Sequence, residues 1–279
     1  MNVFQKVIKY LAMAFAIFLA VVIVGGIATG IFALTGVFNG VAVSGDVVDI
    51  QKSFDDVKSI TVDHGVGILK VKTGSSNQVE VIANNVSEHY SIEKSFSGNL
   101  VLKSKSRFWI FDWFGGKNDY KSDVTIYLPE DFVAEKFEVE AGAGNVVIDG
   151  LKTKKLEIDG GAGDVKGKNI VAQMVDIDGG VGNIDFEQVE LNNTTIDAGV
   201  GNVDIEGILT GKTDIDCGVG NIDLNIKGTT DDYNIKVEKG LGSIRINGQK
   251  YSDLNWNNLT ADNSIDIDGG VGDIDINFE

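Results

Sequence analysis

Cysteine, proline and histidine are almost missing from this sequence. Its 279 residues include one cysteine (Cys217), one proline (Pro129) and two histidines (His64 and His89). A single cysteine excludes a disulfide within the chain. The sequence also lacks the serine–histidine–aspartate pattern of a hydrolase, the ligand spacing of a zinc site and a nucleophile elbow. We therefore predict a protein that is not an enzyme.

Positive charge is scarce as well. The chain has 24 lysine and arginine residues against 41 aspartate and glutamate residues, which gives a formal net charge of −17. Such a chain repels nucleic acids and anionic lipid head groups, so we expect no nucleic-acid partner. Cations, basic partners or simple solubility are compatible with this charge.

The long apolar run lies at the N-terminus. No charged residue occurs between Lys9 and Asp46, and residues 11–38 exceed the roughly 20 apolar residues that cross a bilayer as a helix. Secretory signals have shorter apolar regions, so we predict an uncleaved signal-anchor helix over residues 10–38, with cleavage near residues 42–44 as the alternative. The flanking lysines place residues 1–9 in the cytoplasm, and the chain beyond a linker (39–49) outside the cell membrane.

The predicted anchor also contains a spacing that is typical of helix pairs. Gly26 and Gly30, and again Gly36 and Gly40, are separated as Gly-xxx-Gly, which lets two membrane helices approach closely. Glycine is common in such helices in any case, so self-association through this segment is left open.

A glycine motif repeats along the rest of the chain, as in IDGGVGNIDF (177–186). Its first glycines fall at 142, 161, 180, 199 and 218, a constant interval of 19 residues, and then at 240 and 270. Another copy, VDHGVGILKV (62–71), stands apart near the start. Repeats of this length predict stacked coils, or rungs. We predict an all-β fold, a single-stranded, right-handed parallel β-helix, with regular rungs over residues 136–279 and an N-terminal β region or cap over 50–135.

Three apolar columns run through the aligned repeats. In the copy at 177–186 they are represented by Ile177 before the glycines, Val181 between them and Ile184 after them. Each rung is therefore expected to be a strand, a glycine corner and a second strand with alternating side chains. Stacked rungs would then share one continuous apolar core.

The paired glycines are predicted to be structural turns. The calcium-binding β-roll motif requires aspartate where this repeat has Ile184, and a phosphate-binding loop would lead into a helix rather than a strand. Glycine reaches positive φ without steric cost and lets backbones stack closely. The predicted turn residues are Gly142, Gly144, Gly161, Gly163, Gly180, Gly182, Gly199, Gly201, Gly218, Gly220, Gly270 and Gly272.

An acidic residue stands two places before the first glycine of every repeat. Rungs that stack at about 4.8 Å bring these carboxylates close enough to repel one another. Hydrogen bonds from backbone N–H groups of the same turn would offset this repulsion, and we favour them. Calcium ions held between rungs are the alternative, since oxygen ligands suit hard cations. The candidate ligands are Asp159, Asp178, Asp197 and Asp216.

Two further features of the sequence concern the ends of the β-helix and its contacts with other molecules. Aromatic residues crowd into residues 107–120, where Trp109, Phe111, Trp113 and Phe114 either cap the core or form an exposed loop that touches a partner or the outer membrane leaflet. The chain ends on a strand-like segment, DIDINFE (273–279), without an evident cap. That end is expected to be an exposed edge, to pair with another chain, or to be covered by the loop of residues 247–263.

The sequence resembles a bacterial putative-adhesin family with β-strand repeats, a domain of unknown function related to the head-GIN domain of auto-transporter adhesins. The resemblance rests on the IDGGVGNID rungs, VTIYLPE (124–130) and VGILKVKTG (66–74), and it extends from about Ile50 to the C-terminus. It implies a surface-associated β-helix, often membrane-anchored in Gram-positive bacteria and sometimes linked to envelope stress. It supplies no catalytic residues.

These features together predict a membrane-anchored extracytoplasmic binding or scaffold protein of the bacterial cell envelope. An envelope polymer or a membrane protein is the expected partner. A regulatory ectodomain in the envelope stress response is the alternative, and a polysaccharide-active β-helix enzyme is a remote one. We expect no cofactor, with calcium between the rungs as the alternative.

Overall fold

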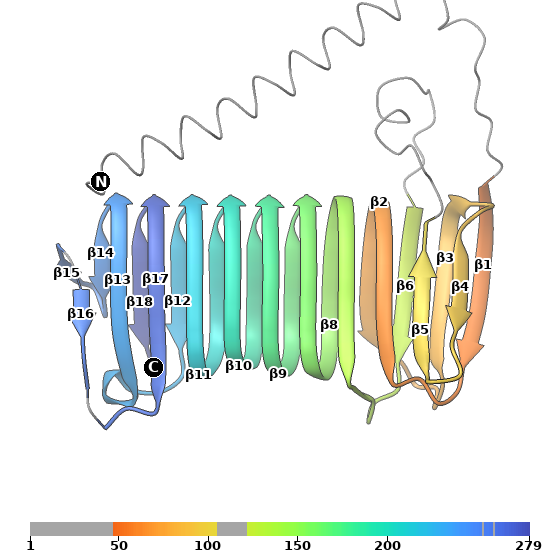
Figure 1. Ribbon diagram of the computed structural model, residues 1–279, viewed down its shortest axis with the longest axis horizontal. Coiled ribbons are helices and arrows are strands. Elements are labelled where there is room, and N and C mark those ends of the chain that lie inside the picture. The colour runs from red at the N-terminus through yellow and green to blue at the C-terminus, as the bar shows by residue number, and fades with distance from the viewer. Residues whose placement is uncertain (1–46, 105–121, 253, 259) are drawn as a thin grey trace, which may run out of the picture. The chain divides into compact units, whose positions relative to one another are not determined.

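The computed structural model describes residues 47–104, 122–252, 254–258 and 260–279, which form one long, open all-β stack (Figure 1). The predicted anchor (10–38) lies outside these residues. In the described part of the chain, no helix is both long and apolar enough to cross a membrane.

The regular middle of the stack consists of four long strands, which are β8 (Lys136–Ala162), β9 (Val165–Val181), β10 (Ile184–Val200) and β11 (Val203–Val219). Each of β9, β10 and β11 runs from one glycine corner to the next. Neighbouring strands pair in parallel with a 19-residue offset, for example Ile177 with Ile196 and Ile196 with Ile215. The parallel stacking predicted from the repeat is confirmed here.

Two of the three apolar columns form the core. The column before the corner includes Ile177, Ile196 and Ile215, and the column after it includes Ile184 and Val203, all buried. Residues between them along each strand alternate outward, as the burial pattern of β9 shows. Full burial of such a side chain contributes about 1.5–3 kcal/mol, so every added rung lengthens a continuous apolar interior.

The N-terminal end mixes parallel and antiparallel pairs. Its strands are β1 (Val47–Phe54), β2 (Ser59–Thr73), β3 (Val79–Ser87), β4 (Ser91–Lys94), β5 (Asn99–Lys103), β6 (Ser122–Leu128) and β7 (Val133–Ala134). The isolated early copy of the motif is in β2, which pairs in parallel with β8 and aligns Val62 with Val139. It is therefore a full member of the stack. Beyond it, β1 with β3, β3 with β6 and β4 with β5 are antiparallel.

The C-terminal end departs from chain order. Its elements are β12 (Ile222–Ile226), the 3₁₀ helix η2 (Thr230–Asp232), β13 (Tyr233–Leu241), β14 (Ile244–Ile246), β15 (Gln249–Tyr251), β16 (Leu254–Trp256), β17 (Asn263–Val271) and β18 (Ile274–Phe278). β11 pairs with β17, and β17 pairs with β13. The last rung of the chain thus lies between the two rungs that precede it in sequence, as Figure 1 shows.

The expectation of an exposed or intermolecular edge at the chain end is wrong, whereas the expectation that residues 247–263 cover this end is supported, since that segment supplies its outer strands. β18 pairs in parallel with β12 on one side and with β14 on the other, so Ile274 faces both Ile222 and Ile244. The outer position is taken by β15 and β16, which pair antiparallel with β14 and β13. The long interval between the last two glycine corners supplies the chain for this return path.

Candidate binding surface

The glycine corners bring neighbouring backbones too close for side chains. At Gly182, where φ is +148°, a Cβ atom would lie 2.0 Å from the carbonyl oxygen of Gly163. At Gly180, a Cβ would lie 2.2 Å from the carbonyl oxygen of Gly161. Both positions therefore accept only glycine without a backbone shift. The same two columns contain Gly142, Gly144, Gly199, Gly201, Gly218, Gly220, Gly270 and Gly272.

An asparagine column connects the corners from rung to rung. The side-chain oxygen of Asn183 accepts a hydrogen bond from the backbone N–H of Asn202 at 2.9 Å, and that of Asn202 accepts one from Asn221 at 3.0 Å. In the same way, the side-chain oxygen of Asp164 accepts a hydrogen bond from the backbone N–H of Asn183. The column links side chain to backbone, and it keeps the corners in register along the edge.

The third apolar column is exposed, so the expectation that all three columns share the continuous core is wrong for this one. Val181 and Val200 lie between their two glycines and remain 59% and 48% exposed. The corner turns this position outward, so it cannot reach the interior. We call the column the apolar ridge, and its residues in spatial order are Val66, Ala143, Ala162, Val181, Val200, Val219, Val271 and Leu241.

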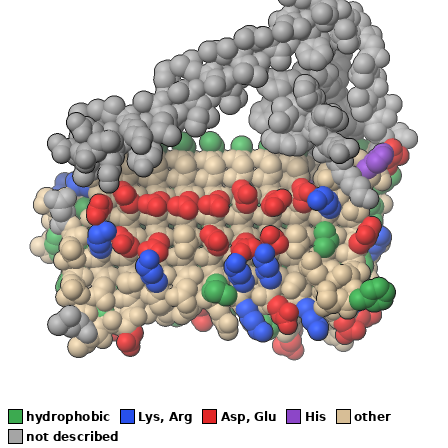
Figure 2. All heavy atoms as spheres, viewed as in Figure 1, with side chains coloured by type: hydrophobic (Ala, Val, Ile, Leu, Met, Phe, Trp, Pro, Cys, Tyr) green, Lys and Arg blue, Asp and Glu red, His purple; other side chains and the backbone are tan. Residues whose placement is uncertain are grey.

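Two acidic columns flank the apolar ridge. The pre-corner column contains Asp63, Glu140, Asp159, Asp178, Asp197, Asp216, Asp268 and Glu238. The post-corner column contains Asp185, Asp204, Asp223 and Asp275 in adjacent rungs, with Lys166 and Arg245 in register at its two ends. Figure 2 shows acidic side chains in a row along the stack, with apolar side chains protruding at the edge above. The alternation of the strands places both columns on the solvent side.

Partial burial and the closeness of neighbouring carboxylates raise the pKa values of several aspartates in these columns. The pKa of Asp197 is raised by partial burial and by the charges of Asp178 and Asp176. Partial burial and the charges of Asp268 and Asp197 likewise raise the pKa of Asp216. In the post-corner column, the pKa values of Asp204 and Asp223 are raised for the same reasons. The carboxylates therefore repel one another in the folded protein.

Only part of this charge is compensated. Arg245 forms an ion pair with Asp275 at 2.9 Å, and Lys166 lies 3.9 Å from Asp185. Among the hydrogen bonds of the described residues, no backbone N–H group donates to the carboxylates of Asp159, Asp178, Asp197 or Asp216. The backbone hydrogen bonds that we expected to offset the repulsion between these four carboxylates are therefore not found. Within the same residues, no group of three or more His, Cys, Asp or Glu side chains is arranged to hold a metal ion.

The aromatic candidates Trp109, Phe111, Trp113 and Phe114 lie outside the described residues. Their segment connects β5 to β6. These two strands pair in parallel with the β2 residues before and after its corner.

Comparison with known protein families identifies the fold. The family model described as Toastrack DUF4097 matches residues 57–279. The chain belongs to the Toastrack family. The match covers nearly all of the stack, and it confirms the resemblance to adhesin-like β-repeat proteins of unknown function. No curated protein matches the chain.

Several solved structures resemble this Toastrack chain. A putative cell adhesion protein from Clostridium sporogenes is 18% identical over 84% of this chain and 100% of its own, with a TM-score of 0.34. A putative adhesin from Bacteroides fragilis is 18% identical over 84% and 98%, with a TM-score of 0.41. A putative lipid binding protein from Parabacteroides distasonis is 12% identical over 85% and 98%, with a TM-score of 0.48. At these values the likeness says nothing about ligands.

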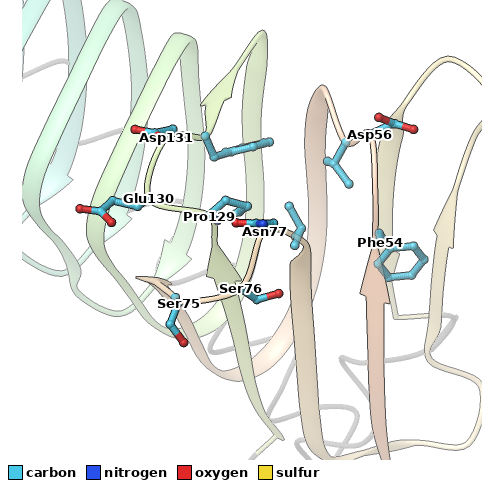
Figure 3. A pocket seen from close by; sticks show the side chains of 12 residues that line it. Phe54, Asp56, Ser75, Ser76, Asn77, Pro129, Glu130 and Asp131 are labelled. Carbon is cyan, nitrogen blue, oxygen red and sulfur yellow. The ribbon is translucent and has the colours of Figure 1, made fainter.

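A hollow of about 420 Å³ opens near the N-terminal end of the Toastrack stack, between the loops that contain Phe54, Asn77 and Phe132. Figure 3 shows that the carboxylates of Glu130 and Asp131 point away from it. Binding sites for small molecules usually combine an apolar wall with converging polar groups. Because its acidic groups diverge, the hollow is not built as such a site.

One contact between serine and histidine was missed in the sequence. Ser122 Oγ lies 3.5 Å from Nε2 of His64, because β6 aligns Ser122 beside the β2 corner. The hydroxyl donates instead to the carbonyl oxygen of Val66, so its proton is not directed at the histidine. Burial lowers the pKa of His64 to about 4, although Asp123 opposes this effect. The neutral, enclosed imidazole fits a packing role better than that of a general base.

Proposed function

We propose that this protein is a membrane-anchored, non-enzymatic binding or scaffold module of the bacterial cell envelope, with its stack on the extracytoplasmic side. One observation carries the proposal: the stack displays a ridge of apolar side chains with an acidic residue before the corner at every rung, and with a second acidic column after the corner over the four rungs of Asp185, Asp204, Asp223 and Asp275. Such a repeated surface suits an extended partner that is bound at many equal points.

The proposal includes two features that rest on the sequence. Residues 10–38 act as a signal-anchor helix, which is supported by the apolar run and the lysines before it. The coils wind in a right-handed sense, which is supported by the strong preference of parallel crossovers for that hand.

The predicted membrane anchoring and outward orientation are tested with the full chain carrying a C-terminal epitope tag. We expect the chain to stay with membranes after alkaline extraction, and the tag to be removed by protease added to intact cells. A chain released by alkaline extraction, or a tag protected until the cells are lysed, would contradict the anchored, outward orientation.

The binding role is tested by retention of the same chain on isolated envelope polymers and by co-purification with membrane proteins. Retention on a polymer supports the binding module, whereas selective co-purification with a sensor kinase supports a regulatory ectodomain instead. Turnover of a glycan would contradict the non-enzymatic proposal.

A further inference from the structure

The apolar ridge is an exposed hydrophobic surface of unusual regularity. Val181, Val200 and Leu241 are 59%, 48% and 62% exposed, and each stands in register with ridge residues of the neighbouring rungs. Isolated apolar residues on a surface need no explanation, but a continuous exposed row marks a contact surface. The ridge extends through the regular middle and through the reordered C-terminal rungs alike.

The backbone beneath the ridge has no free hydrogen-bonding edge. The carbonyl of Val200 accepts from the N–H of Gly182 at 2.9 Å, and the carbonyl of Val219 accepts from Gly201 at 2.9 Å. The carbonyl of Val271 likewise accepts a hydrogen bond from the N–H of Gly220. A partner therefore cannot add here as a β-strand, since β-augmentation needs unpaired backbone groups. A polypeptide partner at the ridge therefore has to satisfy its own backbone hydrogen bonds, as an α-helix does.

The spacing of the ridge matches one face of a helix. Rungs recur at about 4.8 Å, and a helix presents a new turn every 5.4 Å or so. The six ridge positions from Ala162 to Leu241 span about 24 Å, which corresponds to roughly 16 helical residues. Over this length the two spacings drift apart by about 3 Å, within the adaptable reach of leucine or lysine side chains.

The acidic residues beside the ridge determine which charge a bound helix should carry. Asp178 precedes Val181 by three residues, and Asp185 follows it by four, so carboxylates lie on both sides of a helix placed on the ridge. A second copy of this chain would bring acidic columns against acidic columns. An anionic membrane surface would be repelled in the same way. Partial burial and, after it, the neighbouring carboxylates raise the pKa of Asp197 and Asp216, and a helix with lysine or arginine beside its apolar face would relieve the second of these effects.

We propose that the apolar ridge binds a cationic amphipathic α-helix lying along the stack, with its apolar face on the ridge valines and its basic side chains between the two acidic columns. This inference rests on the proposed binding role and names the chemical class of the partner. The ridge supplies affinity through apolar burial, and the columns supply orientation and salt-dependent association.

The test uses the full chain in zwitterionic lipid nanodiscs, with empty nanodiscs as the blank. The probe is a labelled 18-residue helix of leucine and lysine in amphipathic order. Its controls are a scrambled peptide of the same composition, an oligolysine of equal charge, and a helix with glutamate in place of lysine. We expect binding of the first peptide alone, with affinity that falls as salt rises. Carbodiimide cross-linking should join its lysines to Asp178, Asp197 or Asp204.

Matched variants locate the contact. We expect Val181→Ser/Val200→Ser/Val219→Ser to weaken binding at least about tenfold, because the ridge loses three apolar contacts. Removal of the same number of exposed apolar side chains elsewhere, in Val133→Ser/Val171→Ser/Met174→Ser, should change binding by less than about twofold. A second ridge variant with threonine at the three valines preserves β-branched shape and should weaken binding in the same direction.

A second matched pair tests the charges. Asp178→Asn/Asp197→Asn/Asp216→Asn should weaken binding several-fold at low salt and flatten its salt dependence, whereas Glu187→Gln/Glu190→Gln/Glu206→Gln should do neither. Equal binding of the scrambled peptide or oligolysine, or unchanged binding by both ridge variants, overturns the inference. Self-association of the unliganded chain through the ridge, seen by sedimentation, also overturns it. Retention on an envelope polymer without helix binding overturns the partner class but leaves the proposed function standing.

Discussion

The middle and the C-terminal end of the stack use the same repeat but place it in different orders. From β8 to β11, each rung lies directly on the rung that precedes it in sequence. At the C-terminal end, β17 enters between β11 and β13, and β18 enters between β12 and β14. The strands at the C-terminal end are shorter, but the corner residues stay in register in both regions.

The repeat therefore determines how a rung packs on its neighbour but not its position in the stack. Any rung can pair with any other, because each presents the same backbone groups and the same apolar columns. The reordering encloses the last strand and leaves the short β15 and β16 outside. A chain that ended in strict order would expose a long pairing edge instead, which proteins usually avoid.

The largest effect is expected from filling a corner in the regular middle. In Gly201→Val, the new Cβ would lie 1.9 Å from the carbonyl oxygen of Gly182 at a φ of +147°, so we expect a loss of more than about 4 kcal/mol in unfolding free energy. At the C-terminal end, Gly248 has a φ of +76° and nothing within 4 Å of a Cβ, so Gly248→Val should cost only about 1–2 kcal/mol. Denaturant unfolding of both variants measures the contrast, and equal losses would contradict it.

A smaller effect is expected from a cavity in the last strand. Ile276 is fully buried in β18, so Ile276→Ala should lower the unfolding free energy by about 3 kcal/mol. Leu254 lies in the outer strand β16, and Leu254→Ala should cost about half as much. If β18 were instead an exposed edge, Ile276→Ala would be the milder change of the two.

The reordered pairing can be tested directly with a cross-link. Asp216 and Asp268 are register partners, whereas Asp216 and Glu238 are separated by the intervening rung. In a Cys217→Ser background, Asp216→Cys/Asp268→Cys should form a disulfide on oxidation and stabilise the fold by about 2 kcal/mol. Asp216→Cys/Glu238→Cys should remain reduced. Gel mobility and thiol counting distinguish the results, and the opposite preference would restore strict chain order.

The smallest effect concerns the acidic columns. Raised pKa values of Asp197 and Asp216 mean that the folded protein binds protons more tightly than the unfolded chain. Stability should therefore fall as pH rises from the ordinary aspartate pKa through the raised values. Because both side chains are largely solvated, Asp197→Asn/Asp216→Asn should gain only about 0.5–1 kcal/mol at neutral pH and low salt.

This gain should disappear in acid, where the carboxylates are protonated in both states. Glu190→Gln/Glu206→Gln removes equal charge from outside the columns and serves as the control. Thermal unfolding across pH in both variants provides the measurement. A control gain equal to that of the column variant would assign the effect to net charge alone.

Some features of both regions could be predicted from the sequence, and others could not. The 19-residue interval and the alternation around Ile177 and Ile184 were sufficient for parallel stacked rungs and a shared core. The same pattern misplaced Val181, because a valine between two glycines looks like any other apolar column until the direction of the corner is known. It also missed the approach of Ser122 to His64, which depends on pairing between segments far apart in the chain.

By itself, the sequence determined the repeat unit: the β-branched strands, the acidic positions and the glycine corners all follow from local residue preferences and spacing. Only the tertiary structure decided the order of the rungs, the enclosure of β18 and the outward direction of the apolar ridge. The physical reason is that equivalent rungs are interchangeable in local terms. The chain path at the ends, and the need to cover a pairing edge, select one arrangement among them.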